Sequence, residues 1–141
     1  MSRNDITVAV VKGGRSSERE VSLASGAECA RALRSLGYNV VEVDSKLDII
    51  SYLGSLKPNV IFNALHGRWG EDGIVQGCLE WLGIPYTHSG VLASALAMNK
   101  QKARELFALS GLPVANGFII ASETLKSTHP MTTPYVIKPN N

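Results

Sequence analysis

The segment Ile6–Val11 restricts the fold of this chain more than any other stretch. It is β-branched at nearly every position, which favours a strand, and it lacks the polar alternation of a strand with one face in water. A strand of this kind is covered by other elements on both faces. Such coverage is typical of parallel sheets flanked by helices, so the sequence predicts a central parallel strand here.

The residues after this strand predict a turn and then a long helix. Residues 12–17 form a glycine-containing turn, and Ser17 with Glu20 fits a capping box, with Ser22 as a later alternative cap. Apolar residues then recur at helical spacing and stop before Gly37, a typical C-terminal cap. The predicted apolar stripe consists of Val21, Ala24, Ala27, Ala30, Leu33 and Leu36.

Strand and helix patterns alternate through the rest of the chain. The sequence predicts further strands at 39–43, 59–64, 83–87, 116–121 and 135–138. It predicts a short helix carrying Ile49, Ile50, Leu53 and Leu56, a helix over 74–82, and two helices within 91–110. Alternation of this kind predicts an α/β fold, here a Rossmann-like parallel sheet with helices on both faces.

Three polar loops follow predicted strands, at residues 13–17, 66–73 and 88–90. The second loop places a histidine, an arginine and two acids among three glycines, a mixture that is typical of ligand-binding loops. A long connection with solvated charges is the other interpretation. Because ligands bind at the carboxyl ends of parallel strands, we expect the first two loops to lie side by side.

Known phosphate-binding motifs do not account for the first loop. Gly13 and Gly14 lack the third glycine of the dinucleotide fingerprint, and the loop does not end in the Gly-Lys-Ser or Gly-Lys-Thr of a Walker loop. Spacing alone therefore predicts only a Rossmann-like ligand-binding domain.

Composition narrows the class of partners. The 141 residues carry a net charge of +2 with no basic run, so we expect small-molecule partners rather than nucleic acid or a membrane surface. Cys29 and Cys78 stand alone inside predicted helices and have no metal-ligand spacing, which indicates a reduced cytoplasmic protein. No apolar segment approaches the ~20 residues of a membrane span, so we expect neither export nor anchoring.

Four motifs occur in an order that matches a known family. They are GGRSSEREVSL at 13–23, HGRWGEDG at 66–73 with Gln76-Gly77 behind it, PYT at 85–87 and SALAMNK at 94–100. Together they resemble the amino-terminal part of the D-alanine–D-alanine ligases, members of the ATP-grasp superfamily, over essentially the whole chain. The chain departs from the family at His88 and Asn99, where glycine and aspartate are usual, and family chains continue well beyond residue 141.

The resemblance implies a two-step ligation in the cytoplasm that supplies peptidoglycan synthesis and so the cell wall and cell shape. ATP phosphorylates the carboxylate of one D-alanine, and the amine of a second attacks the acyl phosphate. The implied cofactors are ATP and Mg²⁺ or Mn²⁺, with the metal ligands outside this chain. The implied assembly is a homodimer, with no nucleic acid and no membrane.

Particular residues match the family's functional positions. Glu18 and His66 match residues at the first D-alanine, where both are expected to act in catalysis and in binding, and Ser89 is expected to bind the same substrate. Lys100 and Lys138 match lysines that contact ATP phosphates. The structural alternatives are a helix-start glutamate, a loop histidine with satisfied hydrogen bonds, and solvated lysines.

The other side chains of the second loop are expected to support the site. Arg68, Glu71 and Asp72 are expected to shape the loop or lie behind the substrate, and Trp69 is expected to pack rather than to contact it.

The resemblance also implies a division of the chain into two parts. Residues 1–97 are expected to form the Rossmann-like substrate domain, and residues 98–141 are expected to be the incomplete start of an ATP-grasp domain. The chain of residues 1–141 alone is expected to be inactive. Two alternatives stay open: a non-catalytic dimerising domain, and a different ATP-grasp ligase, because fold does not fix function.

Overall fold

The computed structural model describes residues 2–46, 48–124 and 129–140. The chain consists of two compact units, Met1–Ala95 and Leu96–Asn141. The assignment of residues 1–97 and 98–141 to two functional domains stays a prediction.

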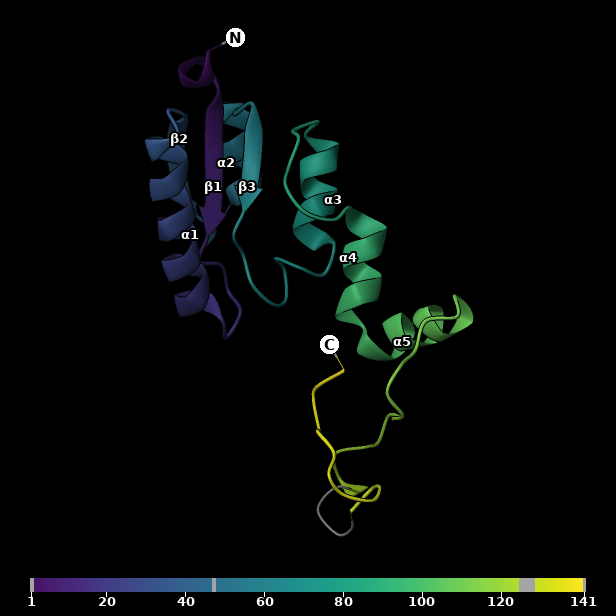
Figure 1. The fold of residues 1–141 in the computed structure, drawn as a ribbon. Helices are drawn as coiled ribbons and strands as arrows, with labels where there is room; N and C mark the ends of the chain where they lie inside the picture. The colour runs from purple at the N-terminus through teal and green to yellow at the C-terminus, as the bar shows by residue number, and fades with distance from the viewer. Residues whose placement is uncertain (1, 47, 125–128, 141) are drawn as a thin grey trace. The chain divides into compact units, whose positions relative to one another are not determined.

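A parallel sheet with the strand order β2-β1-β3 forms the centre of the first unit (Figure 1). The strands are β1 (Thr7–Lys12), β2 (Asn39–Asp44) and β3 (Val60–Asn63). β1 pairs in parallel with both of the others, so the predicted central strand is confirmed. The strand expected at 83–87 is reduced to one parallel bridge between Tyr86 and Ile61, which places this segment beyond β3.

The helices agree with the predicted ones in number and approximate position between residues 19 and 109. They are α1 (Arg19–Ser35), α2 (Ile49–Leu56), α3 (Ile74–Trp81), α4 (Val91–Met98) and α5 (Lys100–Leu109). A short 3-10 helix, η1 (Arg3–Asp5), was not predicted and precedes β1. None of the helices in the described part of the chain is both long and apolar enough to cross a membrane.

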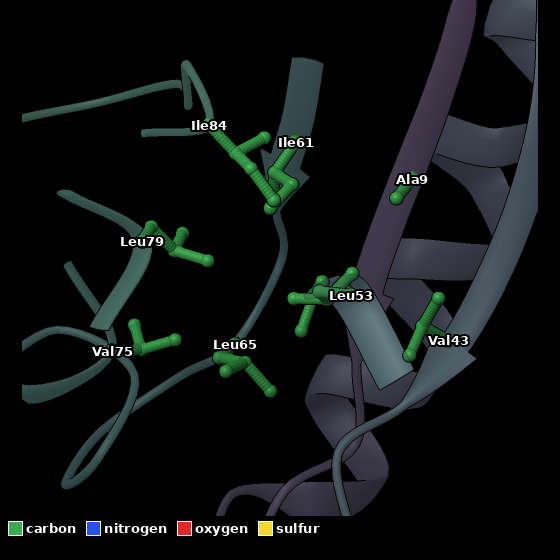
Figure 2. Packing of buried hydrophobic residues seen from close by; sticks show 9 residues of the cluster. Ala9, Val43, Leu53, Ile61, Leu65, Val75, Leu79 and Ile84 are labelled. Atoms are coloured by element: carbon green, nitrogen blue, oxygen red, sulfur yellow. The ribbon is translucent and has the colours of Figure 1, made fainter. Parts of the chain in front are cut away.

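Both faces of the sheet are covered, as the β-branched pattern of β1 predicts. Alternate residues of β1 point to opposite faces. Val8 and Val10 pack with Ala30 of α1 on one face, whereas Ala9 and Val11 pack on the other face with residues of α2 and α3. Figure 2 shows this second cluster, with Ala9, Val43, Leu53, Ile61, Leu65, Val75, Leu79 and Ile84 labelled.

The apolar stripe predicted for α1 is largely wrong. Val21, Ala24, Ala27 and Leu36 are exposed, and the buried residues of the helix are instead Ser22, Gly26 and Ala30. These three small residues recur every four positions on one face. They let the helix backbone approach β1 closely, because a Cβ built on Gly26 would lie only 2.6 Å from Lys12 Cβ.

Replacing Gly26 with alanine is expected to lower the free energy of unfolding by about 1 to 2 kcal/mol. The collision with Lys12 outweighs the gain of about 1 kcal/mol that alanine offers over glycine inside a helix. The matched control is Gly54→Ala in α2, where the new Cβ meets only Leu82 Cδ2 at 3.6 Å. Urea unfolding should show the control stabilised by about 0.5 to 1 kcal/mol. Equal effects of the two substitutions would contradict this packing argument.

The capping box expected at the start of α1 is also wrong. The helix begins one residue later than that pattern requires, with Glu18 at the N-cap position and no side chain capping it. Ser16 Oγ accepts the Glu18 backbone N–H at 3.2 Å instead. The C-terminal prediction is confirmed, because Gly37 has a φ of +90° directly after the helix and donates its N–H to the Arg34 carbonyl.

An ion-pair group centred on Glu42 joins β2 to β1 and α1. Its carboxylate accepts hydrogen bonds from Lys12 Nζ and from Arg34 Nη1. These two hydrogen bonds hold the pKa of Glu42 below its ordinary value of 4.5, against the opposing effect of partial burial.

We therefore expect Glu42→Gln to cost about 1 kcal/mol at neutral pH and less in acid. A lowered pKa contributes stability above the unfolded-state value, near pH 4.5, and that contribution is lost as the pH falls through the lower folded-state value. Urea unfolding at several pH values should show the stabilities of the variant and the unmodified protein converging as the pH falls below the ordinary value of 4.5. A difference that stays constant with pH would contradict this role.

The second unit contains α5 and a long irregular segment. Residues 116–121 and 135–138 form no hydrogen-bonded strand among the described residues, so these two predicted strands are not formed. Their apolar side chains lie largely exposed, with Val136 at 79%. An isolated strand has no partner for its backbone groups, so a local strand pattern alone does not form one.

Candidate functional site

The strand order places a topological switch at the carboxyl ends of β1 and β3. α1 connects β1 to β2, which lies on one side of β1 in the sheet. α2 then connects β2 to β3, which lies on the other side of β1. Parallel crossovers are right-handed, which places α1 and α2 on opposite faces and opens a crevice where the direction changes. Ligands of open parallel sheets bind at this position.

Ser16 joins the loops that follow β1 and β3. Its hydroxyl donates to the His66 carbonyl at 2.7 Å and accepts the backbone N–H of Glu18. Glu18 comes so close to the second loop that a Cβ built on Gly67 would lie 2.4 Å from Glu18 Oε2. The predicted adjacency of the two loops is confirmed, and it brings Glu18 to the backbone next to His66.

His66 is half-buried and has a polar group near each ring nitrogen. Nε2 lies 3.0 Å from Ser25 Oγ on α1, and Nδ1 lies 3.7 Å from Glu71 Oε1. The other oxygen of Glu71 accepts the Gly67 N–H at 2.6 Å, which fixes the carboxylate within the loop. The ring is thus held between a helix and its own loop.

The acids of the second loop shape its backbone, as expected. Asp72 accepts the N–H groups of Trp69 and Ile74, and so joins the loop to the start of α3. Trp69 has a φ of +74°, which is rare for a bulky residue, and the Arg68 guanidinium lies 4.9 Å from its ring centroid. Together with Glu71, which accepts the Gly67 N–H, Asp72 therefore constrains the loop backbone.

Two buried side-chain amides bind the backbone of the same loop. Asn63 and Gln76, which are only 4% and 2% exposed, both donate to the Gly70 carbonyl at 2.9 Å. Asn63 Oδ1 also accepts the Leu65 N–H. Position 70 accepts only glycine without rearrangement, because an added Cβ would lie 2.4 Å from Leu65 Cβ.

An ion pair between Arg19 and Asp44 supports the turn after β1. Arg19 forms two hydrogen bonds with the Asp44 carboxylate, at 2.7 and 2.6 Å, and donates to the Gly14 carbonyl. The Arg19 hydrogen bond holds the pKa of Asp44 below its ordinary value. The turn is thus tied to the end of β2.

A pocket of about 150 Å³ opens beside these loops. Its wall is mainly apolar, and Gly13, Gly14, Arg15 and His66 contribute from the two loops. Leu65, Ile49, Ile50, Ile74, Val75 and Cys78 supply the apolar part. The carboxyl edge of the sheet therefore offers space for a small molecule next to His66.

The remaining predicted site residues lie elsewhere in the chain. Ser89 is exposed in the loop after Tyr86, where its carbonyl accepts the Ser94 hydroxyl. Lys100 and Lys138 are exposed in the second unit, and Lys100 donates its backbone N–H to the Asn140 carbonyl. The roles of all five predicted site residues stay predictions.

Serines of the first turn and of α1 make contacts that the sequence patterns did not predict, and Ser22 lies inside α1 rather than capping it. Ser16 and Ser25 contact His66, and buried Ser22 donates to the Ala64 carbonyl while accepting the Gly13 N–H. A helical spacing of small residues, Ser22, Gly26 and Ala30, was the available signal. It identifies the face of α1 that meets the sheet.

The chain is similar in sequence to known D-alanine–D-alanine ligases. A family model described as the N-terminus of D-ala D-ala ligase matches residues 46–89. The D-alanine–D-alanine ligase of Ruegeria sp. strain TM1040 is 60% identical over 134 residues, which cover 95% of this chain and 44% of that protein. The ligase of Parvibaculum lavamentivorans is 59% identical over 94% of this chain and 43% of its own length.

A solved structure extends the likeness to three dimensions. The Bacillus anthracis D-alanine–D-alanine ligase complexed with ATP is 36% identical, with a TM-score of 0.66, over 75% of this chain and 37% of that chain. This chain spans less than half the length of the curated relatives that it matches. It therefore corresponds, in sequence and in fold, to the amino-terminal part of the D-alanine–D-alanine ligases.

Proposed function

We propose that this chain supplies the first D-alanine subsite of a cytoplasmic D-alanine–D-alanine ligase that uses ATP to make the dipeptide for peptidoglycan. The observation that carries the proposal is the approach of Glu18 to Gly67, the residue after His66, at the switch point of a sheet that belongs to this family's fold. The Glu18 carboxylate holds the substrate ammonium. His66 lies beside the substrate carboxylate, and Ser89 completes the subsite.

The charge of Glu18 fits the ammonium group of an amino acid. Glu18 is exposed, so its carboxylate is available to an ammonium group, and charge-assisted hydrogen bonds of this kind are stronger than neutral ones. Binding at this subsite positions the carboxylate that receives the phosphoryl group from ATP, and positioning accounts for much of the catalysis of phosphoryl transfer.

The nucleotide side of the reaction is assigned to the second unit. Lys100 and Lys138 are exposed there and contact the ATP phosphates in the proposed enzyme. In residues 2–46, 48–124 and 129–140, no group of three His, Cys, Asp or Glu side chains is arranged to hold a metal ion. The described residues therefore do not fit a Mg²⁺ site, and the chain by itself is expected to make no dipeptide.

The direct test is a titration of this chain with D-alanine, followed by NMR of the amides of both loops. D-Alanine is expected to shift the resonances of Glu18 and His66, with L-alanine as the control ligand. Glu18→Gln should weaken D-alanine binding roughly tenfold to a hundredfold, equivalent to about 1.5 to 3 kcal/mol for a charge-assisted bond. The matched control is Glu28→Gln, an exposed glutamate on the same helix that pairs with Arg31. Equal binding by both variants would contradict the assignment of Glu18.

Activity requires the rest of the enzyme. Residues 1–141 can replace the matching part of the Ruegeria ligase, and the chimaera can be assayed for dipeptide and for phosphate release with ATP and Mg²⁺. We expect turnover in the chimaera and none in the chain alone. A folded chimaera without turnover would contradict the ligase assignment.

We also propose that the chain forms a homodimer. Trp81 on α3 is 90% exposed and Leu92 on α4 is 72% exposed, and burial of this apolar surface against a second copy is favourable. Light scattering at micromolar concentrations is expected to give twice the chain mass. A single-chain mass that persists on concentration would contradict the dimer.

A further inference from the structure

We infer that Ser25 is a positioning residue for His66, and that its hydroxyl fixes the orientation of the imidazole ring, with the ring proton on Nδ1 beside Glu71. Ser25 lies on α1, three residues after Ser22, so both hydroxyls lie on the face of the helix that meets the loop after β3. Ser22 Oγ holds the Ala64 carbonyl at 2.6 Å, and Ser25 Oγ reaches His66 Nε2 at 3.0 Å. The functional meaning of this contact rests on the function proposed for His66.

The hydroxyl proton of Ser25 has two possible acceptors. The Ser22 carbonyl lies at 3.4 Å and His66 Nε2 lies at 3.0 Å. A hydroxyl donates one proton, and hydrogen bonds from oxygen weaken rapidly beyond about 3 Å. A ring protonated on Nδ1 accepts this proton at Nε2, whereas a ring protonated on Nε2 donates to Oγ and leaves the hydroxyl proton to the Ser22 carbonyl.

The carboxylate on the other side of the ring favours the tautomer with the proton on Nδ1. Nδ1 lies 3.7 Å from Glu71 Oε1, and Glu71 is held in place by the Gly67 N–H. A neutral ring with its proton on Nδ1 directs an N–H toward the carboxylate, whereas the other tautomer directs a lone pair toward it. The carboxylate thus selects the tautomer with the proton on Nδ1, and in that tautomer the Ser25 hydroxyl donates to Nε2.

This assignment determines what His66 recognises. Nε2 is already occupied by Ser25, and the Nδ1–H lies farther from Glu71 than a normal hydrogen bond allows. The Nδ1–H is therefore available to share with an acceptor oxygen of a ligand. A substrate carboxylate offers such an oxygen and an ammonium group does not.

The test is a long-range ¹H–¹⁵N correlation spectrum of the histidine rings in this chain, recorded at a pH where the rings are neutral. In the unmodified chain we expect a protonated Nδ1 and an unprotonated Nε2 for His66. Ser25→Ala is expected to release the ring from its position beside Glu71 and so to move the two nitrogen shifts toward one another, by roughly a fivefold change in tautomer ratio, equivalent to about 1 kcal/mol. Ser25→Thr retains the hydroxyl and is expected to restore the original shifts.

The control is Ser35→Ala on the same helix, where the hydroxyl donates to the Ala32 carbonyl and has no contact with His66. This substitution should leave the ring shifts of His66 unchanged. A proton on Nε2 in the unmodified chain would overturn the inference without any variant. Unchanged shifts in a folded Ser25→Ala variant would overturn it as well. No D-alanine is present in this experiment, so the result is independent of the titration that tests the proposed function.

Discussion

Replacing Ser22 with alanine is expected to lower the free energy of unfolding by about 2 to 4 kcal/mol, although alanine is the better helix former. The Ser22 hydroxyl is completely buried and serves both the Gly13 N–H and the Ala64 carbonyl. Its loss leaves a donor and an acceptor without partners where water has no access. Each unpaired buried group costs on the order of 1 to 3 kcal/mol. Urea unfolding followed by circular dichroism measures the effect.

The control for this prediction is Ser35→Ala, a change of the same chemistry at an exposed position of α1. It should alter stability by less than about 0.5 kcal/mol. Similar values for the two variants would show that the bonds of Ser22 contribute no more than a surface hydroxyl does. Because Ser22 joins the segments after β1 and β3, we also expect D-alanine binding to weaken in the Ser22 variant.

Replacing Asn63 with aspartate is expected to cost about 3 to 5 kcal/mol at neutral pH, because it puts an unpaired charge in the core. The substitution changes the shape of the side chain very little. It does replace the amide nitrogen that donates to the Gly70 carbonyl with an oxygen that repels it. A protonated carboxyl can donate that hydrogen bond again, so the loss should be clearly smaller at pH 4 than at pH 8.

Asn39→Asp is the matched control. Asn39 is exposed at the start of β2, where its amide donates to Thr7 Oγ1. We expect this variant to lose less than about 1 kcal/mol, with a weak dependence on pH. If the loss of unfolding free energy in Asn63→Asp does not shrink in acid, it comes from something other than the buried charge.

The predictable part of this fold is the part in which each strand and helix carries its own signal. β1 is apolar and β-branched, α3 repeats its apolar residues at helical spacing, and Gly37 ends α1, so these were correctly predicted. The adjacency of the first two loops also followed, because parallel strands end at one edge. The strand order β2-β1-β3 required the structure, since local patterns contain no information on which strands are neighbours.

The wrong predictions all concern contacts between elements, which a local sequence pattern does not contain. The stripe on α1 was assigned by hydrophobicity, yet this helix packs closely on β1, and small residues such as Gly26 occupy the contact. Hydroxyls that looked like caps or surface groups became buried hydrogen-bond partners for the same reason. Residues 116–121 and 135–138 have strand composition, but strand formation depends on partners that a local pattern does not identify.

β2 pairs with β1 along one side only in the described part of the chain, so its other side is an edge of the sheet. An edge strand offers unpaired backbone groups to any other strand, and natural proteins discourage such additions with charged side chains. β2 carries Glu42 and Asp44, both fixed by cationic partners on α1. Sheet-to-sheet aggregation through β2 is therefore opposed by charge. Two copies of the chain would be expected to associate through helices rather than by extending the sheet.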